Sequence, residues 1–417
     1  MSEYAKLLVL FVAVVLAAVS VFAVFSDESL PQVLSDALHA DESAEPPENA
    51  GGNVPENDEI RAVWVTYKEI GSMVRGKSRA EYEAALDGKL SALKELGINT
   101  LFWHTRAFCD ALYLNTEFPV SEYICENGAL PAYDPLETVI EKAKAAGMSV
   151  HAWVNPFRVC TDAAKIPKAA KITDLLKSGD AHYISENGVW LDPACALAQS
   201  FVLECIAELC DNYDIAGVQF DDYFYTADAA EKSCRAYNEY KAAGGTLGIR
   251  RWRTESLSAF MASVYSFIKS KNKNIVFSIS PCGIPEKALN ESLADVSLWC
   301  SGGYADLIVP QIYFGLLNET APFENTAQKW ADMCRESGVK LVCGLAAYKC
   351  GQVDEFAGSG KNEWAENNGI LKDEYSILSK IPQYCGFSLF SLDYCVGENG
   401  NEISETEIKM LKSVLEY

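Results

Sequence analysis

Eight short apolar segments alternate with amphipathic stretches from Arg61 onward, and this alternation constrains the fold more than any other feature of the chain. The apolar segments are rich in β-branched residues, which is typical of buried strands, whereas the stretches between them have a helical period. We predict strands over residues 62–67, 98–105, 149–155, 215–222, 275–281, 305–314, 340–349 and 385–394. Repeated βα units of this kind predict an α/β fold, a (β/α)8 TIM barrel.

Helical segments fall between these strands at the expected places. Residues 82–97, 134–147 and 256–271 have the period of amphipathic helices, and Gly97 and Gly147 are placed as helix C-caps. The 417 residues, of which 49% are hydrophobic, are enough for one large core. We therefore assign the barrel to residues 60–417.

Two segments precede the predicted barrel. Residues 7–25 carry no charge over about nineteen positions, which is long enough to cross the hydrocarbon of a membrane as a helix. Residues 26–59 are rich in Pro, Glu, Asp, Asn and Gly, a composition that predicts a flexible linker. We expect residues 1–25 to be a membrane anchor, with a cleaved signal segment as the alternative.

The flanking charges give a weak indication of topology. Lys6 stands before the apolar run and Asp27 and Glu28 follow it, which favours a cytoplasmic N-terminus and an extracytoplasmic barrel, anchored to the membrane or secreted after cleavage. The fourteen cysteines have neither C-x-x-C pairs nor zinc spacing, so most are predicted to be core residues. In an exported protein this usage suggests a reducing habitat or a few disulfides.

The net charge of −23 argues against nucleic acid as a partner, since the chain has no basic run that could follow a phosphate backbone. A neutral polymer fits this charge better. Polar and aromatic residues also gather where the predicted strands end, which is where barrel enzymes place their chemistry.

The most unusual of these strand ends reads VQFDDYFYT, Val218–Thr226. Side chains alternate between the two faces of a strand, so Asp221 and Asp222 reach one site only if the strand ends and the chain turns there. Cleavage of a glycosidic bond usually needs one carboxylic acid and a second carboxylate, which gives two acids at the mouth of a barrel a chemical role. An N-cap or loop hydrogen-bonding role is the structural alternative.

Of the two neighbours we expect Asp222 to be the reacting acid and Asp221 to bond loop groups or Arg158. Asp393 is the first candidate for the partner acid, because it ends the last predicted strand. Asp110, Asp192 and Glu374 are the other candidates, and a solvated loop carboxylate is the alternative for each.

Several strings in the chain resemble the glycosyl hydrolase-like 10 family of bacterial proteins. They are DALY (110–113), YDPL (133–136), HAWVNPFR (151–158), FDDYFY (220–225), ISPCGI (279–284) and YADLIVPQIYF (304–314), in the order found in the family. The resemblance implies a (β/α)8-barrel glycosidase associated with cell-wall glycans. The chain departs from the family pattern at Ala107 and Phe108, near Phe314 and at SLDY (391–394).

A polysaccharide substrate would be held by residues near the strand ends, since flat rings stack on sugar faces and polar groups bond hydroxyls. The predicted substrate-binding residues are Arg106, Asp110, His151, Trp153, Asn155, Arg158, Tyr223, Tyr225, Gln311, Tyr313 and Tyr348. Arg106 and Arg158 could also grip the lactyl carboxylate of muramic acid. Packing in the barrel is the alternative for the aromatic residues and His151, and a salt bridge to Asp110 or Asp222 for the arginines.

Two other classes of function remain open. A metal-dependent polysaccharide deacetylase also carries acidic residues at a strand end, but such a site needs paired histidines. The four histidines, His39, His104, His151 and His182, have no H-x-x-x-H spacing, so we predict no metal and no cofactor. A glycan-binding protein without catalytic activity is the non-enzymatic alternative, although it could tolerate loss of both aspartates.

Overall fold

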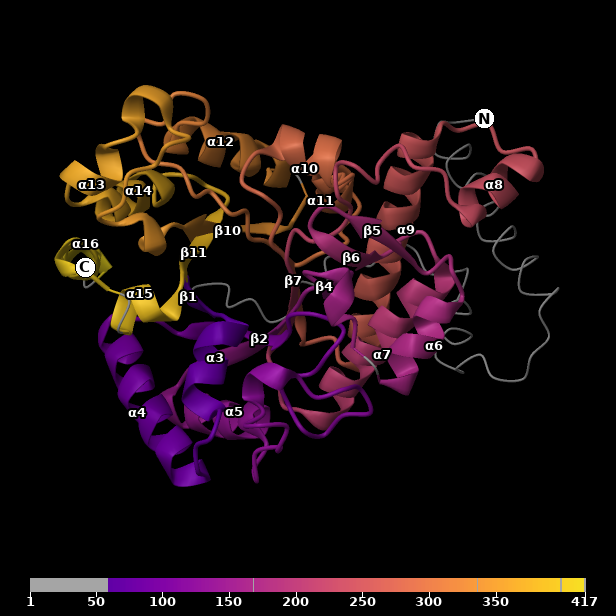
Figure 1. Ribbon diagram of the computed structural model, residues 1–417. Helices are drawn as coiled ribbons and strands as arrows, with labels where there is room; N and C mark the ends of the chain where they lie inside the picture. The colour runs from indigo at the N-terminus through magenta and orange to yellow at the C-terminus, as the bar shows by residue number, and fades with distance from the viewer. Residues whose placement is uncertain (1–58, 168, 336, 398–399, 416–417) are drawn as a thin grey trace.

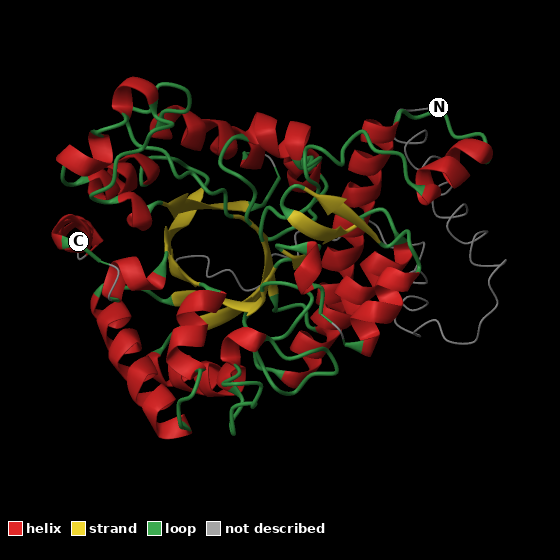
Figure 2. Ribbon diagram, viewed as in Figure 1, coloured by secondary structure: helices red, strands yellow, loops and turns green. Residues whose placement is uncertain are grey.

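The computed structural model describes residues 59–167, 169–335, 337–397 and 400–415. Eight parallel strands close into a barrel in the order β1-β11-β10-β9-β8-β7-β3-β2. These strands are β1 (Ile60–Val65), β2 (Thr100–Arg106), β3 (Ser149–Val154), β7 (Gly217–Phe220), β8 (Val276–Ile279), β9 (Leu307–Ile308), β10 (Lys340–Leu345) and β11 (Tyr384–Phe390). The predicted (β/α)8 barrel is confirmed, and Figure 2 shows its ring of strands surrounded by helices.

Helices cover the outside of the barrel (Figure 1). The longer ones are α3 (Tyr67–Val74), α4 (Arg79–Glu95), α5 (Pro135–Ala146), α6 (Ala170–Lys177), α7 (Ala196–Asn212), α8 (Arg235–Ala242), α9 (Ile249–Lys271), α12 (Phe323–Cys334), α14 (Ile370–Leu378) and α16 (Glu402–Leu415). The shorter ones are α10 (Pro285–Glu291), α11 (Val296–Ser301), α13 (Glu363–Glu366) and α15 (Leu392–Val396). Gly97 and Gly147 follow α4 and α5 with φ of 81° and 80°, as their predicted capping roles require.

The loop after β3 contains an antiparallel sheet that the sequence patterns did not predict. Its strands are β4 (Arg158–Cys160), β5 (His182–Ser185) and β6 (Gly188–Leu191), in the order β4-β6-β5. Each has only three or four residues, too short for a clear alternation of polar and apolar positions. The sheet matters because β4 carries Arg158 toward the end of β3.

Alternate residues of the strands fill two separate cores. Val63 and Val65 of β1 belong to the large core between the barrel and its helices, whereas Ala62 and Trp64 belong to a small core inside the barrel. Trp64 lies in register with Phe102 of β2 and Phe390 of β11. The interior of the barrel is therefore packed with side chains, and any site must lie at one of its ends.

No helix among the described residues is long and apolar enough to span a membrane. The predicted anchor and linker lie outside the described residues, apart from Glu59 at the end of the linker. Glu59 contacts the barrel: its carboxylate pairs with Arg61 and accepts a hydrogen bond from Tyr384, and its backbone oxygen accepts one from Asn99 at 2.8 Å. The folded unit thus includes Glu59, one residue before the predicted boundary.

We predict that a chain of residues 59–417 folds with a higher free energy of unfolding than a chain of residues 60–417. Loss of Glu59 leaves Tyr384, Asn99 and Arg61 without these partners, which should cost about 1–3 kcal/mol. Urea unfolding followed by tryptophan fluorescence measures the difference. Equal stability of the two chains would show that the contacts of Glu59 contribute nothing to the fold.

Candidate active site

Asp221 and Asp222 directly follow β7, at the carboxyl end of the barrel. Gln219 faces the barrel interior, where its side-chain oxygen accepts a 2.7 Å hydrogen bond from Trp64 Nε1. Val218 and Phe220 instead belong to the outer core. The period of two therefore directs Asp221 to the interior, while Asp222 lies beyond the strand where the chain turns.

The two carboxylates are held by different neighbours. Asp221 is 3% exposed, and it accepts hydrogen bonds from Trp153 Nε1 at 3.1 Å and from the backbone N–H of Tyr223 at 3.2 Å. Asp222 is partly exposed and accepts a 3.1 Å hydrogen bond from Gln311 Nε2. Gln311 also donates to the backbone oxygen of Ser280, which fixes its amide. The structure thus brings both aspartates to one mouth.

Both carboxyl groups hold protons more tightly than ordinary aspartates. Burial, followed by the charge of Asp222, raises the pKa of Asp221 well above its usual range. Burial also raises the pKa of Asp222, while Gln311 and the nearby Arg158 charge oppose that shift. The charge of Asp222 is thus one cause of the raised pKa of Asp221, so ionisation of Asp222 makes ionisation of Asp221 less favourable.

A chain of contacts fixes the indole that holds Asp221. His104 stacks on Trp153 with ring centroids 3.7 Å apart and planes at 10°. Its Nε2 lies 3.2 Å from Asn155 Oδ1, and Asn155 Nδ2 donates to the backbone oxygen of Ala107 at 2.8 Å. Burial lowers the pKa of His104 to about 3, so the ring is neutral near pH 7. His104 and Asn155 therefore position Trp153.

Arg158 lies between two aromatic rings near the two aspartates. Its guanidinium is 4.5 Å from the ring centroid of Tyr223 and 5.3 Å from that of Phe108, at cation–π distance. Arg158 Nε is buried and has no hydrogen-bond partner among the described residues. The charge also acts on both aspartates. Arg158 can thus offer a donor to an anionic group of a ligand.

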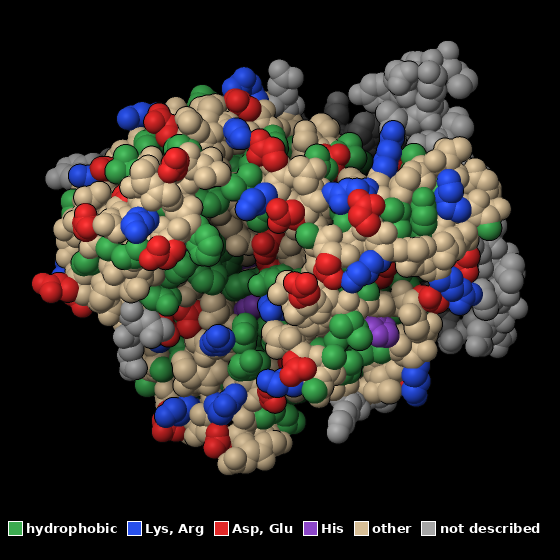
Figure 3. Space-filling view, turned by 45° about the horizontal axis from the view of Figure 1, so that its top comes forward, with side chains coloured by type: hydrophobic (Ala, Val, Ile, Leu, Met, Phe, Trp, Pro, Cys, Tyr) green, Lys and Arg blue, Asp and Glu red, His purple; other side chains and the backbone are tan. Residues whose placement is uncertain are grey.

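Aromatic side chains form the opposite wall of the mouth. Tyr313 contacts Trp64, Tyr348 and Phe390, with ring centroids 6.3, 5.7 and 5.6 Å away. The space-filling view shows a hollow with hydrophobic side chains along one wall and acidic, basic and histidine side chains within it (Figure 3). A mouth with one aromatic wall and convergent polar groups suits a sugar, which has apolar faces and a rim of hydroxyls.

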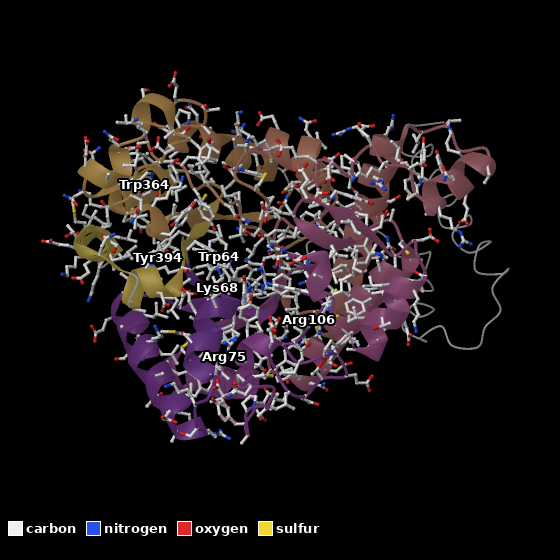
Figure 4. All side chains as sticks on the ribbon, viewed as in Figure 1. Trp64, Lys68, Arg75, Arg106, Trp364 and Tyr394 are labelled. Carbon is white, nitrogen blue, oxygen red and sulfur yellow. The ribbon has the colours of Figure 1, made fainter. Side chains whose placement is uncertain are left out.

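Arg106 and Asp110, two of the predicted substrate-binding residues, are buried away from this mouth. Arg106 is 1% exposed, bonds Tyr113 at 3.1 Å and packs on the Phe118 ring at 4.2 Å. Figure 4 shows Arg106 outside the strand ring and Trp64 near its centre. Asp110 is buried in the loop after β2 beside Ser121, and burial raises its pKa.

Tyr225 and His151 are also removed from the two aspartates. Tyr225 is buried and donates to Asp192 at 2.9 Å, and Asp192 also pairs with Arg253. His151 lies deeper in the barrel than Trp153, against Gly217, where a Cβ would come within 2.4 Å of its ring. Burial lowers the pKa of His151 to about 4. These residues support the barrel from within and around it.

The acids that we considered as partners of Asp222 are not at the mouth either. Asp393 begins α15 and pairs with Lys89 of α4 at 2.8 Å. Glu374 is fully buried on α14, and burial raises its pKa well above its usual range. The last predicted strand ends at Phe390, earlier than expected, so Asp393 lies in a helix instead of on the barrel rim.

Three residues of the mouth were not among the predicted site residues: Trp64, Gln219 and Phe390. Each lies on a predicted strand, and the period of two places Trp64 and Gln219 inside the barrel. That signal was available for AVWVTY, where Trp64 is the only large interior residue. Among the described residues, no group of three or more His, Cys, Asp or Glu side chains could hold a metal ion.

Residues 59–360 match the family described as glycosyl hydrolase-like 10. The chain belongs to this family. It is 30% identical over 345 residues to glycosyl hydrolase DigH of Escherichia coli K12, with 76% of this chain and 77% of that protein covered. It is 27% identical over 322 residues to glycosyl hydrolase YngK of Bacillus subtilis, with 71% and 62% covered. The family and these relatives support a glycosidase-type function.

The fold of this protein is also found in solved structures of other proteins. The glycoside hydrolase domain of PgaB (BpsB) from Bordetella bronchiseptica superposes with a TM-score of 0.56 at 13% identity, covering 86% of this chain and 98% of that one. The catalytic domain of β-amylase from Paenibacillus polymyxa gives 0.56 at 10% identity, with 86% and 99% covered. At such identities the likeness concerns the barrel alone.

We predict that Asp221→Asn makes the free energy of unfolding less dependent on pH between pH 5 and pH 7. The pKa of Asp221 is raised in the folded protein, so the unfolded chain ionises this group at lower pH than the folded protein does. The resulting destabilisation is absent below the unfolded pKa and grows as the pH rises through it. The amide of Asn cannot ionise, so this pH-dependent loss should be absent in the variant, while the exchange of one acceptor oxygen for an N–H donor costs about the same at both pH values.

Urea unfolding at the two pH values measures this difference. Asp174→Asn is the matched control, because the Asp174 side chain is 67% exposed. If the stability of the Asp221 variant changes between the two pH values as much as that of the wild type, the expected cost of burying this carboxyl group is contradicted.

Proposed function

We propose that the protein is a glycoside hydrolase that cleaves a bacterial cell-wall-type polysaccharide, the glycan strands of peptidoglycan, by carboxylate acid–base catalysis. The observation that carries this proposal is the pair of aspartates at the barrel mouth, with pKa values raised by burial. A raised pKa favours the protonated form of a carboxyl group, which can donate its proton to the leaving oxygen of a glycosidic bond.

Asp222 is the proton donor in this proposal. It is the more exposed of the pair and lies beyond the strand, whereas Asp221 is held inside the barrel by Trp153. Gln311 donates to one oxygen of Asp222, and the side chain is partly exposed at the mouth, so the carboxyl group can still reach a substrate. The aromatic wall at Tyr313 and Tyr348 would support a sugar ring beside the scissile bond.

Arg158 supports a cell-wall glycan over a neutral one. Its buried Nε has no partner among the residues that the structure describes, and the guanidinium is held in place by Tyr223 and Phe108. A buried donor without a partner is costly, and a carboxylate of the ligand would satisfy it. Muramic acid carries such a carboxylate on its lactyl group.

We predict that Asp222→Asn lowers the turnover of peptide-free glycan strands by roughly 10²–10⁴-fold, because the amide cannot donate the proton. The measurement is product mass after digestion by the wild type, Asp222→Asn and Asp221→Asn. The surface variant Asp174→Asn should keep full activity. Full activity of both mouth variants would show that neither Asp221 nor Asp222 is the reacting acid. Inactivity of the wild type would leave the proposal without support.

The same digestion tests the two other classes of function. Release of acetate that stops with a chelator would indicate a metal-dependent deacetylase. Binding of strands by the wild type without any cleavage would indicate a glycan-binding protein. Under the proposal, cleavage continues in the chelator, and inactive Asp222→Asn still binds the strands through Arg158 and the aromatic wall.

The proposed substrate lies outside the cytoplasm, so we also propose that the barrel is exported and held there by the apolar segment at residues 7–25. In cells the full chain is expected to sediment with membranes and to be digested by protease added outside. Recovery in the soluble fraction after export would favour the cleaved signal. Protection from the added protease would contradict the proposed topology.

A further inference from the structure

The structure brings the two adjacent aspartates to the mouth but leaves no obvious second carboxylate opposite them. Asp110 lies in the loop after β2 beside Ser121, and Glu374 is fully buried on α14, so neither is free at the mouth. Four other buried or half-buried acids are engaged elsewhere. Glu69 accepts hydrogen bonds from Thr66, Ser391 and Asp393, and ion pairs hold Asp192 to Arg253, Asp354 to Lys349, and Asp393 to Lys89. Among the described residues, Asp221 and Asp222 are thus the acids aimed into the mouth.

Two adjacent residues cannot easily supply both groups of a two-carboxylate mechanism. Their Cα atoms are about 3.8 Å apart, since they are consecutive in the chain. The acid must stand beside the leaving oxygen, while a carboxylate nucleophile or base must approach the opposite face of the sugar ring. Asp221 and Asp222 both follow β7 and so reach the mouth from one side of the barrel, where two groups on opposite faces of a sugar ring are not available.

We propose that the nucleophile belongs to the substrate: it is the carbonyl oxygen of a 2-acetamido group on the sugar whose bond is cleaved. This inference rests on the proposed function and deepens it, because it assigns the nucleophile to the 2-acetamido group that the sugars of the proposed substrate carry. The acetamido oxygen is tethered beside the anomeric carbon, so its attack has the advantage of an intramolecular reaction.

In the first step the acetamido oxygen forms a bond to the anomeric carbon as the bond to the leaving oxygen breaks. Asp222 gives its proton to that oxygen, and Asp221 accepts a hydrogen bond from the acetamido N–H, which becomes more acidic. In the second step water attacks the anomeric carbon, Asp222 takes a proton from the water, and the bond to the acetamido oxygen breaks. The net reaction is hydrolysis with retained configuration.

The contacts of the two aspartates fit these different tasks. Both oxygens of Asp221 already accept hydrogen bonds, from Trp153 and the Tyr223 backbone, which oppose the effect of burial on its pKa and fix the group inside the barrel. Trp153 holds Asp221, and the partly exposed ring of Tyr313 would offer an apolar contact to an acetamido methyl group. Asp222 is more exposed and closer to the open side, where the leaving sugar would lie.

The test changes the acyl group on the substrate while the full chain is kept intact. Peptide-free glycan strands are chemically de-N-acetylated and then re-acylated, one part with acetyl and one with trifluoroacetyl groups. Fluorine withdraws electrons from the carbonyl oxygen and makes it a poorer nucleophile, with little change of shape. Re-acetylated strands should be cleaved as fast as untreated strands. Trifluoroacetylated strands should be cleaved at least about 100-fold more slowly.

The configuration of the new reducing end provides the second readout. Proton NMR during the first turnovers should show the anomer of the original linkage, because two displacements at the anomeric carbon retain it. Inversion, or equal cleavage of acetylated and trifluoroacetylated strands, would overturn this inference but leave the glycosidase proposal standing. No cleavage of untreated strands would overturn the proposed function, and this inference would fall with it.

Variants of the two aspartates separate their roles. An aryl glycoside of an N-acetylated disaccharide has a leaving group that needs little protonation. On this substrate, Asp222→Asn should regain much of the rate of bond cleavage that it loses on glycan strands. Asp221→Asn should not recover, since it no longer helps the acetamido group. Recovery of Asp221→Asn alone would reverse the assignments, and recovery of both would contradict the role of Asp221.

Discussion

The hydrogen bond from Trp64 Nε1 to Gln219 Oε1 crosses the inside of the barrel, and the geometry of the mouth depends on it. At 2.7 Å it joins β1 to β7, which are not neighbours in the ring of strands. The bond gives a partner to Trp64 Nε1 and to Gln219 Oε1 inside the barrel, where an unpaired polar group costs free energy. It also holds Gln219 of β7 toward the interior. Because side chains alternate along a strand, Asp221, two residues later, points the same way.

Closer to the carboxyl ends of the strands than Trp64 and Gln219, the residues around Asp221 are held mainly by polar contacts. The indole ring of Trp153 stacks on His104, and its N–H donates to Asp221, so this one residue links His104 to the acid. Asn155 ties the same assembly to the backbone of the loop after β2. The acid is thereby positioned by strands β2 and β3 as well as by its own strand, which limits how far it can move.

The fold was predictable from the sequence because each strand and helix repeats the same pattern, and the error at any one boundary is small. The site was predictable only where a residue lies within or next to a strand. Asp221, Trp153, Asn155 and Gln311 come together as their positions on strands suggest. Asp393 did not, because β11 ends at Phe390 and a helix starts after Ser391.

Arg106 and Arg158 show the same limit in another form. Both follow predicted strands, but a register shift between His104 and Arg106 accompanies the placement of Arg106 in the outer core, near Phe118 and Phe201. Arg158 instead begins the short strand β4, whose antiparallel partner β6 comes from thirty residues further along the chain. Local pattern does not contain that pairing. The direction of an arginine at the mouth is therefore decided by tertiary contacts, whereas the direction of Asp221 is decided by the period of its strand.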